Sequence, residues 1–368
     1  MTSLSKLLLF AFPAVLVSGC SAIHIPALCH NRPKAFAEKA ALLPSGPNDF
    51  SRPFIEEELA GLSRSFTVFI PRVCYLSHSL GESPPLVDAS RPPVLLCEEL
   101  FTLSPAVLEL GQRLASEGFA VYIPILFGDA REDPNSKWLA IQRYVSFAFA
   151  KPDWKANVPA ASERPIIHEL AGLCRSIAKR HPGKKMGAIG LCISGSFPLE
   201  LLCEAPIVAP VLSQPAMPVV AFDFYRRQSL GMSDEKMQAV RSVIVDRHLS
   251  VLGFRFQLDP ISPPERFAHL RYLLGPAFID ATLPASDYIY RDKCPANAHA
   301  VLTDGFCPWL KGEREKRGHF AYRQLVWFLK TRLEGTSLAE PVYDPNAIAR
   351  HNDSFSDSDF SFGAKCHP

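Results

Sequence analysis

The chain has 368 residues, of which 48% are hydrophobic and 21% are charged, enough for one large domain with additional segments. Its formal net charge is only +2 and it contains no basic block, so the charge pattern argues against a nucleic-acid partner. The ten cysteines include no CxxC pair and no Cys/His spacing suited to zinc, so we expect neither a metal site nor a cofactor.

The N-terminus has the layout of an export signal. Lys6 precedes an apolar run over 7–17 that is short for a membrane span, and small residues then lead to Cys20. Val17-Ser18-Gly19-Cys20 resembles a bacterial lipobox, which implies a signal peptide over 1–19 and a lipid on Cys20 that anchors the protein to a membrane. Three alternatives stay open: an ordinary cleaved signal with a periplasmic or extracellular protein, an uncleaved anchor, and a cytoplasmic protein.

The segment after the signal is irregular before the first clear strands. Residues 20–60 indicate a linker or a cover on the domain, with weak helical character at 54–62. The run over 65–76 is rich in β-formers and predicts one or two early strands. These boundaries place the start of the main domain at residue 61 and its end at residue 335.

A strand, a helix and a second strand follow. Val94–Cys97 is a short apolar run typical of a buried parallel strand. Ser104 and Pro105 give an N-cap and a first helical residue, and Gly118 ends that helix. The next apolar run, over 119–127, completes the βαβ unit of a parallel sheet.

Strands and helices continue to alternate, which predicts an α/β fold with a mostly parallel central sheet and helices on both faces. Residues 128–160 interrupt this order and are interpreted as a lid or a packed insertion, and the Ser/Asp/Asn-rich tail over 336–368 is expected to be disordered. The remaining predicted strands cover 186–191, 207–212, 250–256 and 277–284, and the remaining predicted helices cover 166–180, 233–246, 264–274 and 318–333.

The turn around Cys192 has the pattern of a nucleophile elbow. An apolar strand ends at Leu191, and an apolar helical pattern begins at Phe197. Gly190 and Ser194 supply the small residues needed two positions before and after the tip, where backbone and side chains crowd. A thiolate there would face backbone N–H groups at a helix start. A buried structural cysteine explains this stretch alone equally well.

Polar side chains follow four predicted strands, where open α/β sheets bind ligands. They are Glu99, Cys192, Asp259 and His299. The order nucleophile, acid, histidine is that of α/β-hydrolases. A thiolate would attack an acyl carbon, a histidine would carry the proton, and a carboxylate would orient the histidine.

Over about residues 65–333 the chain resembles the dienelactone hydrolase family, which has the α/β-hydrolase fold. The elbow 190–195 is similar to that family's Gly-x-Cys-x-Gly-Gly, and Glu99-Leu100-Phe101 is similar to its Glu-Ile-Phe-Gly segment. The stretch 104–128, the segment 259–263 and the histidine segment 298–303 also resemble the family.

The resemblance implies a role for each of these residues. Cys192 would be the nucleophile, His299 the base and Asp259 its partner, and Glu99 would pair with Cys192 at rest. The backbone N–H groups of Leu100 and Ile193 would form the oxyanion hole, and water would hydrolyse a thioester acyl-enzyme. The expected substrate is a small ester or lactone, and the residues suggested to bind it are Arg143, Ser213 and Gln214.

Two departures from the family pattern keep a second hypothesis open. Ser194 stands where the family usually has glycine, and Phe101-Thr102 would crowd the oxyanion loop. A catalytically silent lipoprotein that uses the fold as a binding or structural module is therefore the alternative function. The sequence does not give the substrate or the oligomeric state.

Other residues compete for the site roles. Asp280 and His319 form a second acid–histidine candidate, although they enclose no helix and strand between them as the fold requires. Ser194 could replace Cys192 as nucleophile, and Glu98 could replace Glu99. In an exported protein, Cys294 and Cys307 could form a disulfide.

Overall fold

The computed structural model describes residues 35–46, 49, 51–77, 86–99, 103–126, 128–131, 160–161, 163–218, 224–259, 261–283, 299–303 and 320–341. The suggested residues Cys20, Leu100 and Arg143, the cysteines at 294 and 307, His319, most of 128–160 and most of the C-terminal tail lie outside these ranges. No helix within them is long and apolar enough to cross a bilayer.

An eight-stranded sheet forms the centre of the molecule, in the order β1-β2-β4-β3-β6-β7-β9-β10. β2 pairs antiparallel with both β1 and β4, and the strands from β4 to β10 are parallel. The strands are β1 (Phe54–Ala60), β2 (Ser65–Pro71), β3 (Pro93–Cys97), β4 (Ala120–Pro124), β6 (Met186–Leu191), β7 (Ile207–Ser213), β9 (Val251–Phe256) and β10 (Phe278–Leu283). This is the strand arrangement of the α/β-hydrolase fold, as the sequence predicted.

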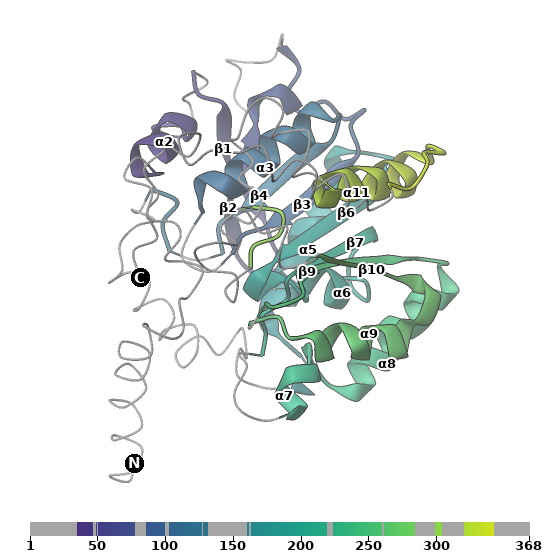
Figure 1. Ribbon diagram of the computed structural model, residues 1–368. Coiled ribbons are helices and arrows are strands. Elements are labelled where there is room, and N and C mark those ends of the chain that lie inside the picture. The colour runs from purple at the N-terminus through teal and green to yellow at the C-terminus, as the bar shows by residue number, and fades with distance from the viewer. Residues whose placement is uncertain are drawn as a thin grey trace, which may run out of the picture.

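Helices cover both faces of this sheet (Figure 1). α3 and α11 lie side by side, and Lys330, the residue after α11, donates to Glu117 at the end of α3 at 2.7 Å. α5 packs against α6. The longer helices are α2 (Ala35–Leu42), α3 (Pro105–Ser116), α5 (Pro165–Arg180), α8 (Asp234–Asp246), α9 (Pro264–Leu274) and α11 (Phe320–Leu329). The shorter elements are η3 (Arg72–Cys74), η7 (Cys192–Ser194), α6 (Phe197–Leu201), α7 (Phe224–Gln228), η8 (Gly275–Ala277), the π-helical η12 (Lys330–Glu334), and the small sheet β5 (Ala160–Ala161) with β8 (Gly231–Met232).

Local signals explain where several of these helices begin. Ser104 Oγ accepts from Val107 N at 3.3 Å, and Pro105 occupies the first position of α3. Ser233 Oγ caps α8 in the same way, accepting from Lys236 N at 3.3 Å. These caps satisfy backbone N–H groups that have no partner inside the helix.

The helical prediction for 54–62 is wrong. Phe54–Ala60 is strand β1, with Phe54 and Ile55 buried and Glu57 half-buried. Three consecutive glutamates favour a helix locally, but antiparallel pairing with β2 satisfies the backbone of this edge strand and overrides that propensity. The sheet therefore starts at Phe54, inside the segment interpreted as a linker or cover.

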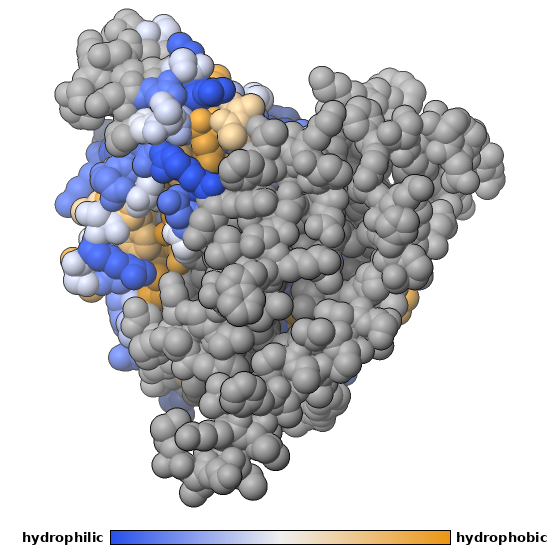
Figure 2. Space-filling model, turned by 90° about the vertical axis from the view of Figure 1, so that its left-hand side faces the viewer, coloured by the Kyte–Doolittle hydropathy of each residue, from blue (hydrophilic) through white to orange (hydrophobic). Residues whose placement is uncertain are grey.

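The interior of the domain is a continuous apolar core. β3, β4 and β6 are buried along their whole length, as expected for parallel strands covered on both faces. On the face drawn in Figure 2, the described residues at the surface are mostly hydrophilic, with smaller hydrophobic areas between them. A sheet buried on both faces holds the loops at the ends of its strands in defined positions.

Candidate active site

Cys192 lies at the tip of a sharp turn, where β6 has ended and the short helix η7 begins. Its φ is +55°, a left-handed conformation that costs energy for a residue other than glycine and is concentrated at functional sites. A Cβ on Gly190 would lie 2.1 Å from Ser194 O, and one on Gly195 would lie 2.5 Å from Pro215 Cα. Glycine is therefore required on both sides of the tip, and the thiol is left partly exposed.

Ser194 is part of the framework of this turn. It is fully buried, and its Oγ accepts from Leu191 N at 3.0 Å. The same hydroxyl lies 3.0, 3.3 and 3.0 Å from the carbonyl oxygens of Leu191, Cys97 and Glu98. The serine thus links the elbow to the end of β3, and its burial argues against the alternative that it is the nucleophile.

Replacing Ser194 with alanine is expected to lower the free energy of unfolding by about 1–3 kcal/mol, because Leu191 N would lose its buried acceptor. Chemical denaturation measures this loss. Alkylation of Cys192 in the folded variant should persist. If the variant instead keeps full stability while losing all acyl transfer, Ser194 is the nucleophile and our assignment is wrong.

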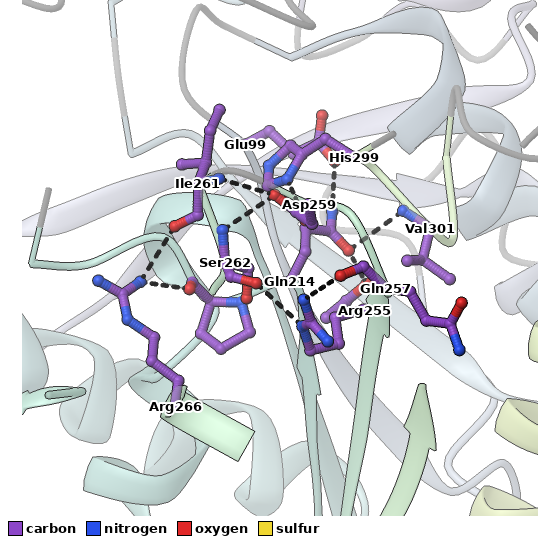
Figure 3. A network of polar contacts seen from close by, with 12 residues as sticks. Glu99, Gln214, Arg255, Gln257, Asp259, Ile261, Ser262, Arg266, His299 and Val301 are labelled. Atoms are coloured by element: carbon purple, nitrogen blue, oxygen red, sulfur yellow. Dashed lines mark hydrogen bonds and ion pairs between the residues drawn. The ribbon is translucent and has the colours of Figure 1, made fainter. Parts of the chain in front are cut away.

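His299 and Asp259 meet although they are 40 residues apart in the chain (Figure 3). His299 Nδ1 lies 2.6 Å from Asp259 Oδ2, and both residues are buried. Asp259 Oδ1 accepts from the backbone N–H groups of Ile261 and Ser262, each at 2.9 Å, which fixes the carboxylate just beyond β9. Ala300 has a φ of +57°, so the chain turns sharply directly after the histidine.

Burial by itself lowers the pKa of His299, but the Asp259 carboxylate and Cys192 together hold it well above its ordinary value. His299 Nε2 is buried, and the side chain that interacts with the ring besides Asp259 is that of Cys192, whose charge and hydrogen bonding raise the pKa of the histidine. With Nδ1 on Asp259, the second ring nitrogen is the one available to exchange a proton with another group.

Glu99 is bonded to the histidine loop. Its Oε1 accepts from Thr303 Oγ1 at 2.8 Å and from Gln214 Nε2 at 3.2 Å. Glu98 is also buried, but its Oε1 accepts from Leu126 N at 2.6 Å, beyond the end of β4. The structure thus brings Glu99, and not Glu98, to the loop that carries His299; the resting pair of Glu99 with Cys192 stays a prediction.

Ser213 and Gln214, which the sequence suggested as substrate-binding residues, are both fully buried. Gln214 Oε1 accepts from Ser213 Oγ and, at 3.2 Å, from Val301 N. With Nε2 on Glu99, the amide joins the end of β7 to the histidine loop (Figure 3). These contacts hold Gln214 between β7 and the histidine loop, and substrate binding by Ser213 and Gln214 stays a prediction. Thr303 is a member of this network that the sequence did not reveal.

Ile193 is the second residue of η7, where no carbonyl within the helix can accept its N–H. An oxyanion-hole donor requires such an unpaired position.

Asp280 forms an ion pair with Arg271 and accepts from the backbone N–H of Thr282 at 2.9 Å. Its carboxylate therefore serves the local structure of β10. Asp259, rather than Asp280, therefore partners a histidine in the described part of the chain.

The sheet order defines a protein with the α/β-hydrolase fold, and a cysteine with a left-handed backbone follows its strand β6. The chain resembles the dienelactone hydrolases. A Saccharomyces cerevisiae protein named "Putative carboxymethylenebutenolidase" is 24% identical over 183 residues, which make up 49% of this chain and 62% of that protein. No protein-family model matches the chain.

Solved structures with similar folds include two dienelactone hydrolase relatives. One, described as a "Putative Dienelactone Hydrolase" from Klebsiella pneumoniae, is 17% identical, with a TM-score of 0.44 over 75% of this chain and 99% of that one. The other is a dienelactone hydrolase-like promiscuous phosphotriesterase from metagenomic libraries, 17% identical, with a TM-score of 0.43 over 75% of this chain and 98% of that one.

Proposed function

We propose that the protein is a cysteine-dependent hydrolase that cleaves a small ester or lactone through a thioester acyl-enzyme. The observation that supports it most is the strained, partly exposed Cys192 at the elbow together with the buried His299–Asp259 pair. The nucleophile, the proton carrier and the group that orients it thus come from three separate strand ends. The S. cerevisiae relative's name points to a lactone as substrate.

Each bond change in this reaction has an assigned group. The Cys192 thiol gives its proton to His299 Nε2 and its sulfur bonds to the acyl carbon. The carbonyl oxygen becomes an oxyanion that accepts from Ile193 N and, we propose, from Leu100 N. His299 then gives its Nε2 proton to the leaving alkoxide as the carbon–oxygen bond breaks. A water molecule that gives its proton to His299 attacks the thioester, and the thiolate leaves, which regenerates the site.

Asp259 keeps the histidine in the orientation that this cycle requires. Its Oδ2 accepts from Nδ1, so the mobile proton is on Nε2, and its charge stabilises the imidazolium. The raised pKa of His299 favours the protonated ring that protonates the leaving group. The Ser194 departure is compatible with this cycle, because its hydroxyl satisfies backbone groups of the elbow.

An acyl-trapping experiment tests the proposal. Purified protein is mixed with p-nitrophenyl acetate and quenched in acid, and peptide mass spectrometry locates the acetyl group. We expect the acetyl group on Cys192, lost on treatment with hydroxylamine at neutral pH as a thioester is. Turnover with the acyl group on another side chain would refute the mechanism. Absence of both turnover and acylation would favour the silent binding module.

We also propose that the N-terminal segment exports the protein and that a lipid on Cys20 anchors it. The motif at 17–20 supports this proposal. In a bacterial host, Cys20→Ala is expected to move the protein from the membrane fraction to a soluble one. Unchanged membrane association of the variant would contradict the lipid anchor, and cytoplasmic wild-type protein would contradict export.

A further inference from the structure

Arg266, in the first half of α9, is a buried cation beside the candidate site. Its side chain is fully buried, and burying a guanidinium is costly unless its donors are satisfied. The partners among the described residues are backbone carbonyl oxygens: Nη1 donates to Pro215 at 2.5 Å and to Ile261 at 3.4 Å, and Nη2 donates to Pro218 and, at 3.4 Å, to Arg226. The charge is thus solvated by dipoles and is not neutralised by contact with a carboxylate of the described chain.

These carbonyls belong to the loops that support the nucleophile and the acid. Pro215 packs against Gly195, and the next residue, Ala216, donates its N–H to Cys192 O at 2.8 Å. Ile261 belongs to the turn whose N–H groups bond Asp259 (Figure 3). One guanidinium therefore ties the support of the elbow to the support of the acid.

The charge of Arg266 acts on the same two residues. Burial lowers the pKa of Arg266 to about 9, and the negative charges of Asp259 and of Cys192 in its thiolate form work against that lowering. Electrostatic interaction is reciprocal, so the cation stabilises both anions by the same free energy with which they stabilise it. A buried site screens this interaction much less than bulk water does.

We propose that Arg266 is a positioning residue for the candidate site: it fixes the elbow loop and the acid loop in register, and its charge stabilises the Cys192 thiolate. This role rests on the proposed function only in taking Cys192 as the nucleophile.

Several other charged groups surround Arg266 and Cys192. His299 and Asp259 face Cys192, and Glu99 bonds the histidine loop. Arg227 of α7 forms an ion pair with Glu265 of α9 at 2.9 Å, and its positive charge repels that of Arg266. Arg255 of β9 bonds Ser262 O at 2.9 Å and interacts with Asp259. Removing Arg266 takes away both its charge and its bonds to the two loops, so a variant that keeps the charge is needed to separate these effects.

The test is the pH dependence of Cys192 alkylation by iodoacetamide, followed at that residue by peptide mass spectrometry. In the folded Arg266→Gln variant the pH midpoint of alkylation is expected to rise by about one unit, because a positive charge near the thiolate is lost. Arg266→Lys keeps the charge and is expected to recover most of the shift. If the glutamine variant does not fold, Arg266→Met replaces it, with the same expected shift.

Arg164 supplies the matched control. It is another fully buried arginine, bonded to Glu200 and, at 2.5 Å, to Gly231 O. Arg164→Gln is expected to lower the melting temperature without moving the Cys192 midpoint. An unmoved midpoint in the folded Arg266 variant, or an equal shift in the Arg164 variant, would overturn the proposal. The readout needs no substrate, so absence of ester turnover would refute the proposed function separately.

Discussion

Replacing Cys192 with alanine is expected to lower kcat/KM for a small activated ester by about 10⁴-fold or more, because the covalent step has no other nucleophile at the elbow. The measurement is steady-state hydrolysis of p-nitrophenyl acetate by the purified protein. Alanine at position 192 must adopt the same left-handed backbone conformation as the cysteine, so the strain is unchanged and the melting temperature should change little.

Cys203→Ala is the matched control for this variant. Cys203 is also a free and partly exposed cysteine, and it follows α6, away from the elbow tip. Its loss should leave the rate within a factor of about two, since it makes no contact in the proposed cycle. Wild-type turnover in Cys192→Ala would exclude the cysteine mechanism. Cys192→Ser is less informative, because a serine could retain part of the rate.

Replacing Asp259 with asparagine is expected to lower kcat by about 10³–10⁴-fold. The amide can still accept from Ile261 N and Ser262 N through Oδ1, so the turn after β9 keeps its bonds. The group that replaces Oδ2 cannot accept from His299 Nδ1, so the histidine loses its orientation and its partner charge. The result that would contradict this role is a folded Asp259→Asn variant with the wild-type kcat.

The same variant should change how stability depends on pH. His299 has a raised pKa in the folded protein, so its pairing with Asp259 stabilises the fold fully below about its ordinary value of 6.5 and loses this contribution as the pH rises through the raised value. The difference in free energy of unfolding between wild type and Asp259→Asn should therefore be largest in acid and shrink as the pH rises. Urea denaturation at a series of pH values measures it. A difference that grows with pH would contradict the raised pKa.

Local pattern was enough to predict most of the sheet and the elbow. Val94–Cys97, Met186–Leu191 and Ile207–Leu212 are apolar runs bounded by turns, and all three are buried strands in the structure. The cap at Ser104 marked the start of α3 because its hydroxyl satisfies a backbone group only three residues away. A cap or an apolar run acts over only a few residues, so the sequence of one short segment is enough to predict the helix or strand that it forms.

The local sequence pattern did not reveal the structure where a contact between residues distant in sequence decides it. The glutamates at 56–58 have helical propensity, yet pairing with β2 makes them part of β1. Arg266 resembles any surface arginine of an amphipathic helix, and nothing near it in sequence marks its burial under the elbow. The bonds of the Gln214 side chain to Glu99 and Val301 join residues far apart in the sequence, so no local pattern revealed them; substrate binding by Gln214 stays a prediction.

By itself, the sequence determined the α/β order, the strained turn at Cys192 and the list of polar residues at strand ends, because periodicity, small residues and caps are local properties. Only the tertiary structure decided which of these residues meet. It brought His299 into contact with Asp259, directed Glu99 instead of Glu98 toward the histidine loop, and placed the charge of Arg266 beside the elbow and the acid loop. The reason is physical: whether a polar side chain is buried, and with which partner, depends on loops that converge only after the parallel strands have assembled.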